Sequence, residues 1–108
     1  MGSIINVTDE NFEELVLKND TPVLVDFWAN WCRPCLQVGS RLEEIAEESG
    51  KEVVIAKFNV DENTLIPSDY GIRSIPYLLM IKGGEIVDSL VGNKSKNDIQ
   101  YFIAENLI

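Results

Sequence analysis

The chain alternates between short apolar runs and stretches with helical spacing, and this order predicts an α/β fold. Val23 to Trp28 is an apolar, β-rich run in which only Asp26 is charged, and a second such run spans residues 53–59. Runs without polar alternation are typical of central strands buried on both faces. Between them, Pro34 to about Ser49 has helical spacing, and Gly50 occupies the position of a C-cap glycine. The apolar positions of this helix are Leu36, Val38, Leu42, Ile45 and Ala46.

The N-terminal part of the chain predicts one further helix. After a short apolar start at residues 4–7, Thr8 or Asp9 is placed to cap a helix that runs to about Lys18. Asn19-Asp20-Thr21-Pro22 then breaks the pattern. The apolar face of this helix is expected to consist of Phe12, Leu15 and Val16.

The C-terminal part predicts a hairpin followed by a helix. Two apolar runs, residues 77–81 and 85–91, flank Lys82-Gly83-Gly84, which is a hairpin pattern. Helical spacing returns over residues 97–107 through Ile99, Phe102, Ile103 and Leu107. The β-α-β unit favours parallel strands and the hairpin adds an antiparallel pair, so we expect an α/β fold with a mixed sheet.

Composition indicates one ordinary soluble domain covering residues 1–108. The chain is 45% apolar and 25% charged, has no linker or repeat, and has no apolar run long enough to span a bilayer. The net charge of −9 would repel nucleic-acid phosphates and anionic lipids, so neither nucleic acid nor membrane is an expected partner. The N-terminus has no basic region typical of an export signal, and we expect a cytoplasmic monomer.

The candidate chemistry lies in Trp31-Cys32-Arg33-Pro34-Cys35, which holds both cysteines of a chain without histidine. Such cysteines can be simple buried apolar residues or half of a zinc site. A structural zinc site needs four ligands, and this chain supplies two, so no metal is expected. A Cys-x-x-Cys pair beside a β-α-β unit is typical of reversible dithiol exchange.

The position of the two cysteines assigns their roles. Pro34 suits the first turn of a helix, which places Cys32 just before the helix N-terminus. The helix dipole and the cation of Arg33 both favour the thiolate there, and thiolate is the attacking species in disulfide exchange. We therefore expect Cys32 to be the nucleophile and Cys35 the resolving thiol.

With these segments in view, the chain resembles the thioredoxin family over essentially its whole length. The resemblance rests on residues 23–35 and on four later segments, Ala56 to Asp61, Tyr70 to Pro76, Lys82 to Glu85 and Val91-Gly92. It implies the thioredoxin fold, a central mixed sheet flanked by helices. It also implies a disulfide-reducing site at the start of the second helix and a cis peptide between Ile75 and Pro76.

Two charged residues interrupt the apolar strands. Burial of Asp26 among apolar neighbours would raise its pKa and suit a proton acceptor near neutral pH. Lys57 interrupts the second strand, and the resemblance implies that it pairs with Asp26 beneath the active site. We expect Asp26 to assist deprotonation of Cys35, and Lys57 either to share this catalytic role or to extend to solvent.

The resemblance also implies a surface that recognises substrate. Trp31, the Ile75-Pro76 backbone and Gly92 would form a shallow apolar surface around Cys32, with Arg33 and Pro34 beside it. An extended segment of a protein substrate would lie there and pair through its backbone. Trp28 belongs either to this site or to the core, and Tyr70 and Tyr77 either to the core or to the rim.

Four positions depart from the usual family pattern. Arg33 replaces glycine and Leu36 replaces a common lysine, so one nearby cation is exchanged for another. Gly39-Ser40 stands where a proline usually bends the helix, and either a bend or a straight helix is compatible with that pair. Tyr77 replaces the threonine after the cis proline, which alters the surface offered to substrates.

Three function classes follow from these residues. The first is a reductase of protein disulfides with no bound cofactor, recycled by a separate thioredoxin reductase. The second is a thiol oxidase or disulfide isomerase with the same cysteines, since the reduction potential rather than the fold sets the direction. The third is a redox-independent binding module that uses only the apolar surface.

Overall fold

Five strands form one mixed sheet in the computed structural model, which describes residues 3–108. The strand order is β1-β3-β2-β4-β5. Both β1 and β2 run parallel to β3, whereas β4 runs antiparallel to β2 and β5. This confirms the predicted mixed sheet. The strand bounds are Ser3–Val7 (β1), Val23–Trp28 (β2), Val54–Asn59 (β3), Tyr77–Lys82 (β4) and Glu85–Val91 (β5).

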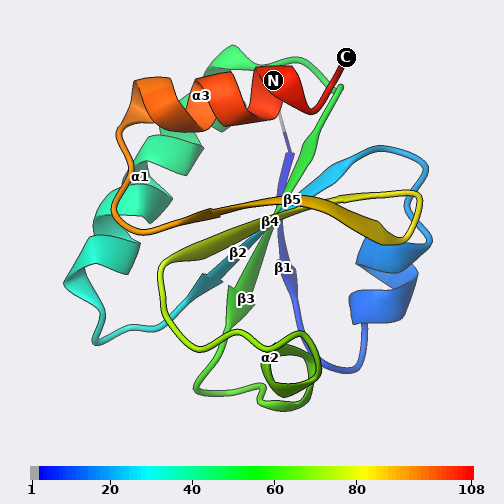
Figure 1. Ribbon diagram of the computed structural model, residues 1–108, viewed down its shortest axis with the longest axis vertical. Helices are drawn as coiled ribbons and strands as arrows, with labels where there is room; N and C mark the ends of the chain where they lie inside the picture. The colour runs from blue at the N-terminus through cyan, green and yellow to red at the C-terminus, as the bar shows by residue number, and fades with distance from the viewer. Residues whose placement is uncertain (1–2) are drawn as a thin grey trace.

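Helices cover both faces of the sheet. The long helices α1 (Arg33–Glu48) and α3 (Lys96–Glu105) lie on one side, and the blue N-terminal helical turn η1 (Glu13–Leu17) lies on the other (Figure 1). The short helix α2 (Leu65–Asp69) packs Ile66 against the same core cluster as η1. Sequence reasoning did not predict α2, because five residues are too few for a periodic signal.

The central strand β2 separates two apolar cores, as its uninterrupted apolar pattern predicts. Leu24 packs with residues of α1 and α3, whereas Val23, Val25 and Phe27 pack on the η1 side. Because side chains alternate along a strand, Asp26 shares the α1 side with Leu24. The fold therefore places one carboxylate directly beneath the helix that carries both cysteines.

The first predicted helix forms in the expected place, but it contains a π-helical turn that was not predicted. Thr8 caps it as expected, because the Thr8 hydroxyl accepts the N–H of Asn11 at 3.3 Å, and Phe12 has helical φ and ψ. Residues 13–17 form a single π-helical turn, in which the N–H of Lys18 donates to the carbonyl of Glu13 at 2.9 Å. Phe12 and Val16 are buried as predicted, whereas Leu15 is 36% exposed and lies off the apolar face. Asp9 caps a different helix, since its carboxylate accepts the N–H groups of Leu65 and Ile66 at the start of α2.

Helix α1 has the predicted length, but Gly50 does not cap it as predicted. The C-cap residue is Ser49, whose N–H and hydroxyl both donate to the carbonyl of Ile45, and Gly50 does not adopt the left-handed conformation of a C-cap glycine. Leu36, predicted on the apolar face, is 51% exposed in the first turn beyond the edge of the core. The helix continues through Gly39 and Ser40.

The C-terminal hairpin and helix form as predicted. Gly83 and Gly84 both have positive φ, 60° and 82°, which suits the tight turn between β4 and β5. Ile99, Phe102 and Ile103 of α3 are buried against α1. Within residues 3–108, none of the helices combines the length and the apolar character required to cross a bilayer.

Candidate active site

Cys32 is the N-cap residue of α1, as the position of Pro34 predicts. Its backbone is extended, with φ −91° and ψ 100°, and Pro34 lies in the first turn. The sulfur of Cys32 accepts the N–H of Cys35 at 3.2 Å and is joined to Cys35 in a disulfide. A helix N-terminus offers unpaired N–H groups and a positive dipole end, so this sulfur lies where a thiolate is stabilised.

The two cysteines differ in exposure. Cys35 is fully buried, whereas Cys32 retains 5% exposure at the surface. Trp31 next to it is 71% exposed, and Arg33 and Pro34 are also exposed. Of the two cysteines, only Cys32 thus has any exposed surface.

A second loop lies against the cysteines from the β4 side. The Ile75–Pro76 peptide is cis, as the family resemblance implied, and Ile75 packs against the cluster formed by Ala29, Cys32 and Cys35. The N–H of Gly92 donates to the carbonyl of Pro76 at 3.0 Å, and Gly92 has φ of 104°, a conformation that favours glycine. The structure thus brings Ile75, Pro76 and Gly92 together on one side of the disulfide.

An apolar hollow of about 190 Å³ extends the site beside Trp31. It connects the indole to the loop before the cis peptide. The sequence did not predict this hollow, because its residues come from the turn after β3, from α2 and from that loop. No periodic pattern or motif marks them. Its remaining lining residues are Val60, Pro67, Ile72, Arg73, Ser74 and Ile75.

Asp26 and Lys57 form a pair beneath α1. They are register neighbours on the parallel strands β2 and β3, and Nζ of Lys57 lies 3.5 Å from a carboxylate oxygen of Asp26. That distance permits an ion pair but is too long for a strong hydrogen bond. Asp26 is fully buried, and neither of its oxygens has a hydrogen-bond partner among residues 3–108.

Burial raises the pKa of Asp26 from 3.8 to about 6. Desolvation of the charged form is the largest cause, and the ammonium of Lys57 lowers the pKa and offsets part of that effect. A carboxyl group with a pKa near 6 can accept and release a proton close to neutral pH. The site therefore holds a carboxyl group that titrates near neutral pH, on the face of the sheet that α1 covers.

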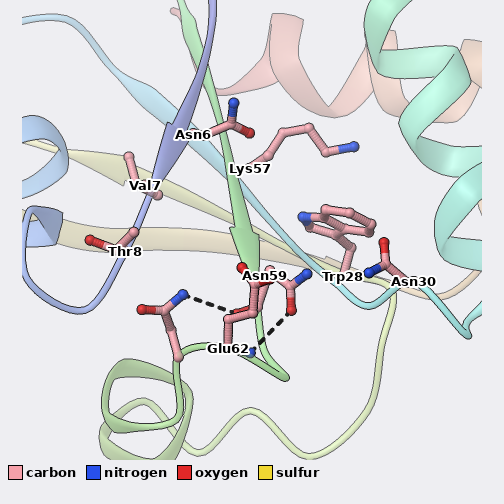
Figure 2. A pocket seen from close by; sticks show the side chains of 9 residues that line it. Asn6, Val7, Thr8, Trp28, Asn30, Lys57, Asn59 and Glu62 are labelled. Atoms are coloured by element: carbon pink, nitrogen blue, oxygen red, sulfur yellow. Dashed lines mark hydrogen bonds between the residues drawn. The ribbon is translucent and has the colours of Figure 1, made fainter.

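Lys57 connects this buried pair to solvent. Its side chain is 18% exposed, and its ammonium lies 4.8 Å from the centre of the Trp28 ring. Both residues line a polar cavity of about 290 Å³, where Lys57 extends past Trp28 toward α1 (Figure 2). Lys57 thus lies beside the carboxylate and also extends to solvent. A role beside Asp26 and extension to solvent, the two alternatives that the sequence offered, are therefore compatible.

Trp28, Tyr70 and Tyr77, which the sequence did not assign to either the core or the site, lie between the core and the surface. Trp28 is half-buried and packs against the disulfide cluster, so it joins the core to the site. Tyr70 and Tyr77 are half-buried at the edge of the core on the η1 side. Tyr70 also contacts the ring of Phe12 edge-on at 5.6 Å.

Gly39 gives the ammonium of Lys57 its room. A Cβ atom at Gly39 would lie 2.8 Å from Nζ of Lys57. We expect Gly39→Ala to displace the ammonium toward the polar cavity, where water screens its charge, and to raise the pKa of Asp26 above about 6. The measurement is the carboxyl titration of Asp26 by NMR.

Ser40→Ala is the matched control for this change, because Ser40 is exposed on the same helix. Gly39→Ala should also add up to ~1 kcal/mol of helix stability, which does not depend on Asp26. An unchanged titration of Asp26 in Gly39→Ala would show that Lys57 keeps its position beside the carboxylate.

Within residues 3–108, no cluster of three or more His, Cys, Asp or Glu side chains is arranged to hold a metal ion. The reactive groups brought together here are two sulfurs, a buried carboxylate and an ammonium. Disulfide exchange requires only the sulfurs and a proton acceptor, so this set is sufficient for that chemistry.

Comparison with known proteins agrees with this chemistry. The thioredoxin family model matches residues 3–105. A thioredoxin from Chlorobaculum thiosulfatiphilum is 48% identical over 106 residues, covering 98% of both chains. A thioredoxin from Rickettsia bellii is 51% identical over 102 residues, covering 94% of this chain and 97% of the relative.

The similarity extends through both sides of the site, from the strand before the cysteines to the segment after Gly92. Fold, disulfide and sequence therefore lead to the same conclusion. The chain belongs to the thioredoxin family, whose members reduce protein disulfides through a Cys-x-x-Cys pair, here Cys32 and Cys35.

Proposed function

We propose that Cys32 is the attacking thiolate and Cys35 the resolving thiol of this protein-disulfide reductase. The difference in exposure carries the assignment, because Cys32 caps α1 at the surface while Cys35 is fully buried. A substrate disulfide can meet only the first sulfur. Cys35 then needs to reach only Cys32, whose sulfur already accepts its N–H.

The reaction proceeds in two exchanges. The Cys32 thiolate attacks one sulfur of the substrate disulfide, and the other substrate sulfur leaves as a thiolate. Cys35 loses its proton and attacks the Cys32 sulfur, which releases the second substrate thiolate and leaves a Cys32–Cys35 disulfide. Two electrons pass to the substrate, and the present structure corresponds to the oxidised product.

Asp26 accepts the proton of Cys35 through water in this proposal. Its pKa of about 6 suits that task, and Lys57 modulates the charge of the carboxylate from 3.5 Å. The polar cavity beside Trp28 and Lys57 provides a route by which the proton returns to solvent. Trp28 lines this cavity and also packs against the cluster of Ala29, Cys32 and Cys35.

The substrate segment lies against the surface formed by Trp31, Ile75, Pro76 and Gly92. Exposed Trp31 and the neighbouring hollow offer apolar contact, and the backbone at the cis peptide offers hydrogen bonds. Arg33 and Pro34 border Cys32 and contact the substrate close to the reacting sulfur. Backbone pairing makes the recognition tolerant of sequence, which suits a reductase with many substrates.

Dithiol exchange in the thioredoxin family requires no bound cofactor, because both sulfurs belong to the protein, and thioredoxin reductase returns the oxidised form to the dithiol. We propose that the partners of this chain are such a reductase and cytoplasmic proteins with disulfides. We further propose that it acts as a monomer in the cytoplasm, since its charge of −9 opposes self-association.

The deciding experiment is the Cys32–Cys35 reduction potential, measured by equilibration against glutathione with the bound thiols followed by mass. A potential near −270 mV, about that of thioredoxin, supports the reductase. A potential near −180 to −120 mV, the range of disulfide isomerase and oxidase, would assign the chain to the second function class. Activity that survives removal of both cysteines would indicate the redox-independent binding module.

Arg33 is expected to raise this potential. An exposed cation beside Cys32 stabilises the thiolate and thus the reduced form, so Arg33→Gly should lower the potential. The shift should be on the order of 10 mV, because exposed charges interact weakly and about 30 mV corresponds to a tenfold change in equilibrium. Arg33→Lys keeps the charge and serves as the control. An unchanged or higher potential in Arg33→Gly would contradict the effect.

A further inference from the structure

Helix α1 binds the segment after Gly92 through a row of polar side chains. Gln37, Arg41, Glu44 and Glu48 recur at intervals of four, three and four, which places them on one face of α1. Each of them forms a hydrogen bond or ion pair with residues 93–100. The β5–α3 loop accordingly lies beside α1 (Figure 1).

The part of this row nearest the active site is a brace formed by Gln37, Arg41 and Asn93. Nη1 of Arg41 donates to the side-chain oxygen of Asn93 at 2.6 Å and to the carbonyl of Lys94 at 2.8 Å. The amide nitrogen of Asn93 donates to Gln37 at 2.7 Å. Both ends of the Asn93 amide are therefore held by α1.

The brace acts on the backbone that faces the cysteines. Asn93 follows Gly92 directly, and the N–H of Gly92 donates to the carbonyl of Pro76. A further bond from the N–H of Lys94 to the carbonyl of Gly92, at 2.9 Å, closes the loop. Through these contacts, the helix that begins beside Cys32 is tied to the opposite wall of the site.

We propose that Arg41 and Asn93 are positioning residues that hold the Gly92 loop at a fixed place relative to Cys32. The inference rests on the proposed substrate surface at Pro76 and Gly92. Arg41 lies nine residues after Cys32, about 14 Å along the helix axis, so it does not touch the reacting sulfurs. Its effect is on how a protein segment fits beside Cys32, and not on the reactivity of the sulfur.

The distal part of the row provides an internal control. Lys96 pairs with Glu48 at 2.6 Å and with Glu44 at 3.3 Å, and thereby joins α3 to the same face of α1. These pairs include neither Asn93 nor the backbone next to Gly92. Loss of the Lys96 pairs should affect the α1–α3 contact without moving the wall of the site.

The test compares Asn93→Ala, Arg41→Met and their double variant with Lys96→Met. Asn93→Ala changes no charge, so electrostatic steering does not confuse the result. The protein substrate is insulin, whose disulfides are reduced in the assay. We expect the KM for insulin to rise by roughly two- to tenfold in each brace variant, because the loss of one or two hydrogen bonds changes a binding constant by about that factor. The double variant should show little further rise, because both changes break the same contact.

Two further readouts separate positioning from general stability. Reduction of oxidised glutathione, which needs no extended segment on the wall, should keep its rate in all variants. Hydrogen exchange at the Gly92 amide should be faster in the brace variants and unchanged in Lys96→Met, since that N–H is bonded to Pro76.

The inference is overturned if KM for insulin is unchanged in Asn93→Ala and Arg41→Met, if both substrates lose rate equally, or if Lys96→Met raises KM as much. Wild-type protein reports separately on the proposed function. If wild type fails to reduce insulin at all, the proposed function fails first, whatever the variants do.

Discussion

Replacing Cys35 with serine should convert this protein from a catalyst into a trap for its substrates. Cys32 keeps its place at the N-terminus of α1 and still attacks a disulfide, so the mixed disulfide still forms. The buried sulfur that would resolve it is absent. Each molecule therefore reacts once, and turnover with protein disulfides should fall to the uncatalysed background.

Nonreducing electrophoresis and intact mass give the measurement. Cys35→Ser should accumulate covalent complexes joined through Cys32, and a thiol reagent should release them. Cys32→Ser is the matched control, because it removes the exposed sulfur and keeps the buried one. If Cys32→Ser instead forms the adducts and Cys35→Ser forms none, the assigned roles of the two cysteines are reversed.

Replacing Asp26 with asparagine should stabilise the protein at neutral pH. The folded-state pKa of Asp26 is about 6 against 3.8 for the ordinary group, so the folded state binds this proton more tightly than the unfolded state. Stability contributed by the protonated carboxyl is present below pH 3.8 and is lost as the pH rises through about 6.

The difference of about 2.2 pKa units between those two values corresponds to about 3 kcal/mol at pH 7. Asp26→Asn avoids that cost, so its free energy of unfolding should exceed that of wild type by up to ~3 kcal/mol at pH 7 and by little at pH 3.5. Urea unfolding at several pH values measures this. Asp20→Asn, a change at an exposed aspartate, is the control and should show no such pH-dependent gain.

The same variant should lose catalytic rate. This change removes the proton acceptor proposed for Cys35, so resolution of the mixed disulfide should slow by about tenfold or more at pH 7. A more stable protein that works more slowly identifies a buried charge kept for function. A variant that is more stable and equally fast would remove Asp26 from the mechanism.

Local pattern predicted the parts of this fold that depend on local rules. The β2 run is apolar without alternation because both of its faces are buried, and the Gly83-Gly84 turn needs positive φ at both residues. The first helix formed where its pattern predicts it, with Thr8 as its cap. Its π-helical turn was not predicted, nor was the binding of Asp9 to the start of α2, because that contact joins segments far apart in the chain.

Sequence patterns alone predict the chemistry, because they include two cysteines at a helix N-terminus, a carboxylate among apolar residues, and a family pattern that runs through both. The surroundings of these groups depend on the tertiary structure. Gly39 lies against Lys57, and the hollow beside Trp31 is formed by three separate segments. Arg41 forms a hydrogen bond with Asn93, which is 52 residues later in the chain. Local spacing reports which residues share a helix or strand, whereas contacts between elements depend on how those elements pack.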